Sequence, residues 1–486
     1  MARKTKILLE GNIDKREVGY YSTPEFVANY LAQEMIQINP NGRYVLDPAV
    51  GKEELVHAFY NAGKIVDSYD IIDFGNHQHS NFCEMNFIDV YEQMLNDSFF
   101  QTAINSKYDY IIANPPYNCH EVQYIHDNKK RLNALFKVGA YNMYSMFLSA
   151  LIDIAKDGCL IGVIVSDSFL TSSYHNKLRQ QIFDSCSIHQ ILLCPSDLFW
   201  SQKADVRTCI LILQKGRSYQ GPVSICNRPR NAIELEDILA NHRLKKVSLN
   251  EIRLSKNTTL NQFLIDVSPS IISLIHTNPS LGSLYKCVTC ISTGNDKKYL
   301  SKDKVPGFTI PFYKNPASRK FVTEPDAFLI DDFMGESLIV KDFMVRNKSL
   351  LSQEGVVCSS MGLPFSAAYL PEDGVSGVNP TIFPPKDEIY WLIAYLNSSF
   401  VTYIVRGVLI RSNMITSGYV SHIPIITFSE EEKNTLATIS KNVIDGVFNV
   451  SQAIELIDKL IFAKNIFPKE VESQIYDFCR DLQRRV

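Results

Sequence analysis

The stretch YDYIIANPPYN, residues 108–118, is an apolar run that ends abruptly in Asn114-Pro115-Pro116-Tyr117. Two prolines cannot continue a strand ladder, and each holds its φ at about −65°. They therefore fix the directions of the Asn114 side chain and of the neighbouring backbone carbonyl at the end of a buried strand. A rigid pair of acceptors can grip both protons of an exocyclic amine and leave its lone pair free to attack an electrophile. Tyr117 then offers a flat face on which a base can stack.

Short β-rich runs alternate with amphipathic stretches over the first 215 residues. The predicted strands are 44–49, 64–71, 108–114, 159–166, 188–194 and 208–215, and the clearest predicted helices are 24–36 and 144–156. Continuous apolar strands separated by helices indicate a mostly parallel sheet that is covered on both faces. The expected fold class is therefore α/β, a doubly wound Rossmann-like domain that binds its ligands at the carboxyl ends of the strands.

The pattern changes after about residue 220 to short irregular elements rich in Gly, Pro, Asn and Ser. A second domain is expected to start between residues 220 and 280, and we divide the chain into 1–220 and 221–486. The second part is expected to be mixed α+β with a helical C-terminal tail, in which Ser429 and Glu432 have the spacing of a capping box.

Composition narrows the class of protein only slightly. The chain has 486 residues, 45% of them hydrophobic, and a formal net charge of −3, which excludes a uniformly basic surface but allows a local basic cleft. Its eleven cysteines are scattered, and the one CxxC, Cys287 and Cys290, has no second pair, so no metal is expected. No apolar run reaches the roughly 18 residues of a membrane span, and a cytoplasmic protein is expected.

Three further motifs precede the NPPY in the order that a cofactor site needs. YVLDPAVGKEEL (44–55) places Asp47-Pro48-Ala49 and then Gly51 between a strand and a helix, where an α/β domain receives a nucleotide-like cofactor. About twenty residues later a second strand ends in Asp70, which suits ribose hydroxyls. Asn86 and Phe87 in MNFID offer contacts to the edge and the face of an adenine ring.

Together these motifs resemble the gamma-class N6-adenine DNA methyltransferases of the TaqI type. YYSTPEFVANYL (20–31) is similar to the first motif of that family, which implies that Tyr21, Thr23 and Pro24 lie at the cofactor. SDLFWSQKADVRTCILILQK (196–215) is similar to a later motif whose aromatic residue contacts a flipped base, here Phe199. The segments 290–300, 377–384 and 390–400 are similar to parts of the family's target recognition domain.

The resemblance implies a methyl transfer from S-adenosyl-L-methionine to adenine N6 in double-stranded DNA, with the base flipped out of the stack. It also implies a restriction–modification system. The chain has no convincing PD…(D/E)xK nuclease pattern, so we expect modification without cleavage, any partner restriction endonuclease being encoded separately, and we expect a monomer. Loop residues of the second half are expected to grip the DNA phosphates: Lys297, Lys298, Lys314, Arg319, Lys320, Arg346, Lys348, Arg406 and Arg411.

Two positions depart from the family pattern. The glycine-rich cofactor loop usually continues Gly-Ser-Gly, but this chain has Gly51-Lys52-Glu53, and Asn86 stands where Asp is usual. Glu53 either faces the carboxylate of the cofactor and repels it, or points to solvent from the first turn of a helix. We expect the solvent-facing arrangement, because a helix start tolerates an acidic residue well.

Three other functions remain open at this point. An NPPY methyltransferase can act on RNA or on a protein glutamine, since both present a similar amine. A second alternative is a catalytically dead DNA-binding module, for which Glu53 is the only argument from the sequence. Methylation of cytosine N4 is the third, and it is disfavoured because that class more often has Ser at the first motif position.

Overall fold

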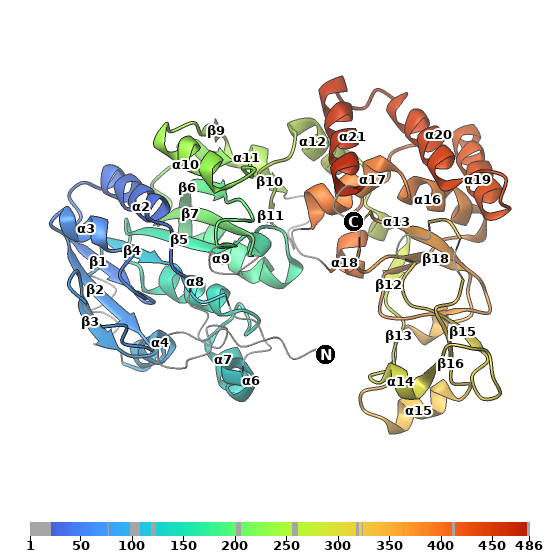
Figure 1. Cartoon of the computed structure of the whole chain (residues 1–486), viewed down its shortest axis with the longest axis horizontal. Helices are drawn as coiled ribbons and strands as arrows, with labels where there is room; N and C mark the ends of the chain where they lie inside the picture. The colour runs from blue at the N-terminus through green and yellow to red at the C-terminus, as the bar shows by residue number, and fades with distance from the viewer. Residues whose placement is uncertain are drawn as a thin grey trace. The chain divides into compact units, whose positions relative to one another are not determined.

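The chain divides into two compact units. The computed structural model describes residues 21–75, 77–97, 107–117, 123–200, 206–254, 261–316, 320–322, 324–362, 364–410 and 414–483. Contacts within the chain separate a first unit, Met1–Asp266, from a second, Val267–Val486. Figure 1 shows the two units in blue to green and in yellow to red, and each is described below by itself.

A nine-stranded sheet forms the centre of the first unit, in the order β3-β2-β1-β4-β5-β7-β6-β8-β9. Strands β1 to β5 are parallel to one another, whereas β7 runs antiparallel between β5 and β6. The strands are β1 (Tyr44–Asp47), β2 (Ile65–Asp70), β3 (Asn81–Glu84), β4 (Tyr110–Ala113), β5 (Leu160–Ser166), β6 (Cys186–Leu193), β7 (Thr208–Lys215), β8 (Val223–Cys226) and β9 (Lys245–Val247). The expected doubly wound α/β fold is confirmed.

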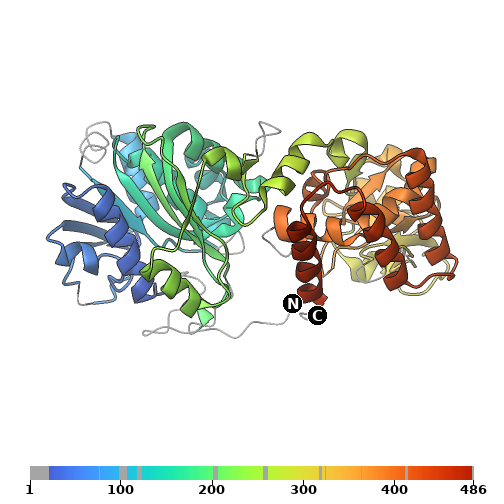
Figure 2. The same ribbon diagram turned by 90° about the horizontal axis from the view of Figure 1, so that it is seen from above.

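Helices cover both faces of this sheet (Figures 1 and 2). They are α2 (Glu25–Ile38), α3 (His57–Asn61), α4 (Phe87–Asn96), α6 (Gln123–Asp127), α7 (Lys129–Leu135), α8 (Met143–Ile154), α9 (Asn176–Ser185), α10 (Ala232–Ala240) and α11 (Leu249–Ile252). Successive strand residues alternate between two cores. Val45 and Ile112 pack with α2, α3 and α10, while Leu46 and Ile111 pack with α4, α8 and α9. Burial on both faces explains why these strands read as continuous apolar runs.

The functional motifs meet at one edge of the sheet because their strands are parallel. Strand β1 ends at Asp47, β2 at Asp70 and β4 at Ala113, directly before Asn114. The strand order reverses between β1 and β4, since the chain moves outward to β2 and β3 on one side and to β5 on the other. Doubly wound folds bind their ligands in the crevice at such a switch point.

The first unit extends beyond the expected boundary at residue 220. Strand β8 pairs with β6, and β9 pairs with β8, so residues 223–247 belong to the same sheet. Phe263, on the short strand β11 (Gln262–Phe263), is fully buried and stacks on Phe183 of α9 with ring centroids 4.9 Å apart. The boundary is therefore corrected to residue 266, within the 220–280 range that the change of pattern indicates.

The second unit combines small sheets with helices. One sheet has the order β12-β21-β18-β19, a second has the order β14-β16-β15-β20, and β13 pairs with β17. These strands are β12 (Lys286–Val288), β13 (Ile291–Ser292), β14 (Leu300–Ser301), β15 (Ile310–Tyr313), β16 (Ala327–Leu329), β17 (Met344–Val345), β18 (Gly355–Cys358), β19 (Ala367–Leu370), β20 (Val375–Ser376) and β21 (Thr381–Phe383). The mixed α+β character expected for this half is confirmed.

The main helices of the second unit are α12 (Pro269–Thr277), α14 (Asp296–Tyr299), α15 (Phe333–Ile339), α16 (Ile389–Leu396), α17 (Ser399–Tyr403), α19 (Glu430–Ile444), α20 (Val450–Phe462) and α21 (Lys469–Gln483). The capping box expected at Ser429 and Glu432 is present at the start of α19. No single helix in the described part of the chain is long and apolar enough to cross a membrane. One bent pair, Lys386–Leu396 and Ser399–Leu409, meets that test of length and composition.

We predict that residues 1–266 fold on their own and that residues 1–220 do not. Removing residues 221–266 deletes β8 and β9 and exposes an edge of β6, whose eight residues are all buried. It also removes Phe263 from the core. An exposed, long, apolar strand edge is a site of aggregation. Thermal unfolding followed by circular dichroism, with size-exclusion chromatography, checks this. Cooperative unfolding of monomeric 1–220 at the temperature of 1–266 would contradict it.

Candidate active site

Asn114 joins the turn after β4 to the segment that precedes α2. Its amide nitrogen donates to the Tyr21 carbonyl oxygen at 2.8 Å and to Thr23 Oγ1 at 3.0 Å. Pro115 is buried and Pro116 is half-buried, so the turn is packed in place. Pro24 is the N-cap residue of α2, and its carbonyl accepts the first helical hydrogen bonds. The structure therefore brings together the NPPY motif and the residues expected at the cofactor.

Tyr117 points back into the protein. Its hydroxyl lies 2.6 Å from Asn114 Oδ1 and 2.9 Å from the Ile164 carbonyl oxygen on β5, and it can donate its one proton to either. Burial raises the pKa of Tyr117 far above its usual range, so the hydroxyl stays protonated and remains a donor. Asn114 Oδ1 has a second lone pair, which is available to an incoming amine.

The aromatic residues expected to stack on a base form a closed cluster. The ring centroids of Tyr21, Tyr117 and Phe199 lie 5.9 to 6.3 Å from one another. Tyr117 is 9% exposed and Phe199 is 1% exposed, so neither ring offers a free face in this structure. Trp200, the next residue, is 64% exposed. Trp200 is not among the residues predicted from the sequence, although the adjacent aromatic pair Phe199-Trp200 was a signal for it.

The turn after β1 is bound to the end of β2. Asp47 Oδ1 accepts from the Ala49 backbone N–H at 3.0 Å, which closes a tight turn through Pro48. The Gly51 N–H then donates to Asp70 Oδ2 at 2.9 Å. Gly51 has a φ of +56°, a conformation that favours glycine. The predicted proximity of this turn and Asp70 is therefore present in the structure.

The acidic corner, formed by the turn after β1 and the end of β2, contains carboxyl groups whose negative charge the described residues do not neutralise. Asp47 is fully buried, and its Oδ2 has no hydrogen-bond partner among the described residues. Burial raises the pKa of Asp47 well above its usual range, and the carboxylates of Asp70, Glu54 and Glu53 add to this effect. Burial likewise raises the pKa of Asp70, against the hydrogen bonds from Gly51 and Ile72. These acceptor oxygens suit a positively charged ligand that carries hydroxyl groups.

The two residues expected to contact an adenine ring are engaged elsewhere. Asn86 is the N-cap of α4: its Oδ1 accepts from Ile88 N at 3.0 Å, and its amide donates to the Tyr124 hydroxyl at 3.2 Å. Phe87 is 1% exposed and packs on Phe147 in the core, so its ring has no free face. Ile71 follows Asp70 directly and is 50% exposed. It is an apolar surface beside the site that the sequence analysis missed.

Glu53 does not face solvent, and that expectation was wrong. The side chain is buried, and its carboxylate accepts hydrogen bonds from the segment that connects β2 to β3. The helix that begins nearby, α3, starts only at His57. The carboxylate therefore does not interact with a helix N-terminus.

The basic residues of the second unit differ in their exposure. Lys297, Lys298 and Lys348 are exposed, whereas Lys320 is buried and donates to the Asn397 carbonyl oxygen, so Lys320 is removed from the set expected to contact DNA. Burial lowers the pKa of Lys320 to about 8. The remaining members have these positions: Lys314 pairs with Asp296, Arg346 and Arg406 are half-buried, and Arg319 and Arg411 lie outside the described residues.

A groove of about 450 Å³ in the second unit is lined by both polar and apolar residues. Its lining includes Thr293, Asn295, Asp296, Lys297 and Lys314. Thr293 Oγ1 and Lys314 Nζ both bind the Asp296 carboxylate. The segment 290–300, expected to belong to a recognition domain, thus lines a hydrogen-bonding surface.

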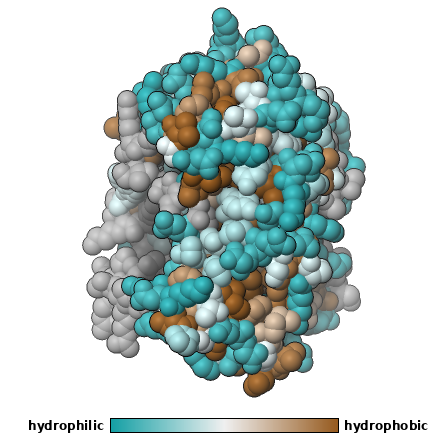
Figure 3. Space-filling view, turned by 90° about the vertical axis from the view of Figure 1, so that its right-hand side faces the viewer, coloured by the Kyte–Doolittle hydropathy of each residue, from teal (hydrophilic) through white to brown (hydrophobic). Residues whose placement is uncertain are grey.

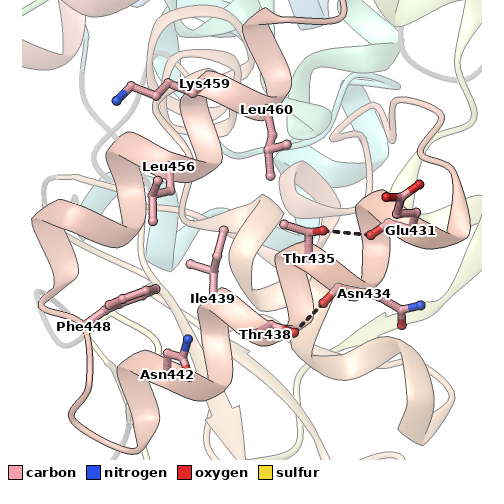
Figure 4. A pocket seen from close by; sticks show the side chains of 10 residues that line it. All are labelled: Glu431, Asn434, Thr435, Thr438, Ile439, Asn442, Phe448, Leu456, Lys459 and Leu460. Carbon is pink, nitrogen blue, oxygen red and sulfur yellow. Dashed lines mark hydrogen bonds between the residues drawn. The ribbon is translucent and has the colours of Figure 1, made fainter.

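A second groove in the same unit, of about 840 Å³, lies between α19 and α20 (Figure 4). The Thr435 and Thr438 hydroxyls donate to carbonyl oxygens one turn earlier on α19, at 2.9 and 2.8 Å. The rest of its floor is formed mainly by apolar side chains such as Phe448 and Leu456. None of the residues that the sequence predicts for methyl transfer or DNA contact lines this groove.

Hydrophobic side chains also gather at the lower end of the face shown in Figure 3, the level at which α15 lies in Figure 1. Leu338 and Ile339 at the end of α15 are 81% and 84% exposed. Carboxylates flank the helix at 331, 332, 336 and 342. Because DNA phosphates repel such charges, this surface is a poor candidate for contact with DNA.

Cys287 and Cys290 are packed side chains. Cys290 is buried in a hydrophobic cluster, and Cys287 Sγ lies 3.4 Å from the Ser417 carbonyl oxygen. Within the ranges that the structure describes, no group of three or more His, Cys, Asp or Glu side chains could hold a metal ion.

Comparisons with known proteins identify the family. The model of the N-6 DNA Methylase family matches residues 8–260, which is more than half of the chain and almost the whole first unit. The Type II methyltransferase M.BsuBI of Bacillus subtilis is 24% identical over 511 residues, covering 92% of this chain and 94% of that protein. The Type II methyltransferase M.BanIII of Aneurinibacillus aneurinilyticus is 28% identical over 208 residues, 37% of this chain and 36% of that one.

Solved structures show the same fold over both units. The chain in a DrdV–DNA complex superposes with a TM-score of 0.58 at 11% identity, over 88% of this chain and 57% of that one. A nuclease-deletion mutant of the Type ISP restriction–modification enzyme LlaGI, in complex with a DNA substrate mimic, superposes with a TM-score of 0.56 at 12% identity. This match covers 88% of this chain and 55% of that one. The family match and the M.BsuBI relative thus define an adenine-specific DNA methyltransferase. The chain belongs to the N-6 DNA methylase family.

We predict that Asp47→Asn stabilises the protein without its cofactor and weakens cofactor binding. Because burial raises the folded-state pKa of Asp47, its carboxyl contributes full stability below the unfolded pKa of about 3.9, and that contribution is lost as the pH rises through the folded pKa. At pH 8 the neutral amide should therefore add about 1–2 kcal/mol to the free energy of unfolding.

The measurement is thermal unfolding of the cofactor-free protein at pH 8 and at pH 4, with the wild type beside the variant. The stabilisation should shrink towards pH 4, where wild-type Asp47 is protonated. A variant that is less stable than wild type at pH 8 would contradict the prediction, because it would show that the buried, charged carboxylate does not destabilise the folded protein.

Proposed function

We propose that the protein transfers a methyl group from S-adenosyl-L-methionine to adenine N6 in double-stranded DNA, within a restriction–modification system. The observation that carries the proposal is the fixed position of Asn114. Its Oδ1 lies at the end of β4, next to the switch point of the sheet, and keeps one lone pair free. Asn114 Oδ1 and the Pro115 carbonyl would orient the amine, and positioning would supply most of the rate.

The cofactor assignment is supported by the charge of the site. S-adenosylmethionine would supply an electrophilic methyl group on a positively charged sulfur. Asp47, whose Oδ2 lacks a partner, and the acidic residues around it offer the negative surroundings that such a cation needs. Asp70 would accept hydrogen bonds from the ribose hydroxyls, and Ile71 would pack beside the adenine ring. Asn86 and Phe87 would support the site through the start of α4, with no direct contact to the ring.

A flipped adenine needs an aromatic surface, and we assign that surface to Trp200. Tyr117 is only 9% exposed and its hydroxyl holds Asn114, so Tyr117 is assigned to holding the catalytic amide. Phe199 would support Trp200 from the closed cluster. Trp200 remains exposed in this structure and is free to contact a base.

We assign target recognition to the second unit. Support comes from the groove at 291–297, where hydroxyl, amide and ammonium groups could read base edges. The exposed Lys297, Lys298 and Lys348 would bind phosphates. Methylation of RNA or of a protein glutamine gives no comparable role to a unit of this size. DNA as the substrate is consistent with a cytoplasmic enzyme whose partner nuclease is a separate protein.

The direct test is incubation of the purified protein with labelled S-adenosylmethionine and, in parallel, duplex DNA, RNA or protein. Mass spectrometry of digested DNA should then show N6-methyladenine. Label in N4-methylcytosine, RNA or glutamine would replace the proposal by the corresponding alternative. Absence of cofactor binding in calorimetry would favour a DNA-binding module without catalysis.

We predict that Asn114→Ala lowers the single-turnover rate of DNA methylation about 100-fold or more, since one of the two acceptors for the amine is lost. Thr23→Val is the matched control. It removes one contact of the Asn114 amide nitrogen but leaves Oδ1 in place, and it should cost less than about tenfold. Equal losses in both variants would mean that Asn114 acts only by holding the segment before α2.

We predict that Trp200→Ala lowers DNA methylation about tenfold, because stacking of a base on an aromatic ring contributes roughly 1–3 kcal/mol. The chain has two tryptophans, and the other, Trp391, is buried. Binding of DNA should therefore quench the fluorescence of Trp200, and Trp200→Phe should abolish the quenching while it preserves most of the activity. Wild-type fluorescence that DNA leaves unchanged would remove Trp200 from the site.

A further inference from the structure

Glu53 stands where the family's cofactor loop has a glycine, and it keeps the glycine conformation. Its φ is +65°, in the left-handed region that side chains other than glycine rarely adopt. Such a conformation costs of the order of 1–3 kcal/mol and persists only where the surroundings enforce it. A side chain placed there needs compensating contacts, and the structure shows where they are.

The Glu53 carboxylate is saturated by donors from one segment. Oε2 accepts from the Gln78 N–H at 3.0 Å and lies 2.9 Å from His79 Nδ1, and Oε1 accepts from the Ser80 hydroxyl at 2.7 Å. The His79 N–H lies 3.1 and 3.2 Å from the two oxygens. Burial acts to raise the pKa of Glu53, but these hydrogen bonds outweigh it and lower the pKa below its usual value. The group is thus held as a carboxylate.

These donors lie in the connection between β2 and β3, residues 71–80, which contains no helix or strand in the described positions. The same connection begins directly after Asp70 and carries Ile71 at its start. Further contacts extend the arrangement: the Ser80 hydroxyl lies 2.6 Å from Ser68 Oγ on β2, and the His79 ring packs edge-on against His57 of α3 with centroids 4.7 Å apart.

The turn after β1 and the connection after β2 are therefore joined at two points. The first is the hydrogen bond from the Gly51 N–H to Asp70, and the second is the Glu53 carboxylate. A glycine at position 53 would leave the Gln78 and His79 N–H groups without this partner. One side chain thus fixes a segment that lies about 25 residues further along the chain.

We infer that Glu53 is a positioning residue for the cofactor: it locks residues 71–80 against the turn after β1 and so holds Asp70 and Ile71 in their binding positions. The inference rests on the proposed use of S-adenosylmethionine at this edge of the sheet. The carboxylate points to the connection, where hydrogen bonds from several donors stabilise it. Glu53 thereby replaces the flexibility of a glycine loop by a fixed anchor.

The test measures cofactor affinity and turnover separately. Glu53→Gly should raise the Kd and the KM for S-adenosylmethionine at least tenfold, while kcat at saturating cofactor stays within about threefold of wild type. Glu53→Gln keeps one acceptor oxygen and should give an intermediate Kd. Glu84→Gln, which removes an exposed carboxylate at the end of β3, controls for the change of net charge and should bind as wild type does.

A second measurement covers the case in which Glu53→Gly folds poorly. Hydrogen exchange of the Gln78 and His79 amides should be slow in the wild type and faster in Glu53→Gln, with the amides of β4 and β5 unchanged. A lower unfolding temperature with an unaltered Kd would mean that Glu53 is structural only. Tighter binding by Glu53→Gly would mean that the carboxylate repels the cofactor, and either result overturns the inference. A wild-type protein that binds no S-adenosylmethionine would instead refute the proposed function.

Discussion

The Asn114 side chain is the contact on which the rest of the site depends. Its amide nitrogen holds the segment at Tyr21 and Thr23, and its oxygen is held by Tyr117. Tyr117 is in turn fixed on β5 through the Ile164 carbonyl. A rotation of this one amide would therefore disturb β4, β5 and the start of α2 together. Such mutual support holds an acceptor in the precise direction that catalysis by positioning requires.

The acidic corner at the ends of β1 and β2 contains two buried carboxylates, Glu53 and Asp47, which differ in their hydrogen-bond partners. Glu53 meets several donors, so its pKa is lowered although the side chain is buried. Among the described residues Asp47 receives only the Ala49 N–H, and burial raises its pKa. A group whose burial is compensated within the protein stabilises the fold, whereas an uncompensated group favours a ligand that brings the missing charge. The same corner therefore contains one residue that maintains the structure and one that favours binding.

Most of the fold could be predicted because its signals are local. Apolar runs of four to eight residues predicted six of the nine strands of the first sheet within a few residues, and the strand ends predicted the places of Asp47, Asp70 and Asn114. Strand β3 was not predicted. The buried position of the Glu53 side chain could not be predicted from the sequence. Its hydrogen-bond donors at 78–80 lie far along the chain, and a solvent-facing place at a helix start suited an acidic residue equally well. The boundary at 220 failed for a related reason. A change in composition marks a change in local structure, whereas β8 and β9 join the first sheet through pairing with β6, which composition does not reveal.

The aromatic residues show how far a motif determines a role. The sequence indicates that Tyr117 and Phe199 lie near each other, and their rings lie 6.3 Å apart. It does not indicate that both are buried, because exposure depends on how Tyr21 and the turn pack around them. A buried tyrosine with a saturated hydroxyl holds its neighbour in place more readily than it receives a base. The adjacent Trp200 is exposed instead, so the motif indicates where the proposed site lies, and packing decides which aromatic ring has an exposed face.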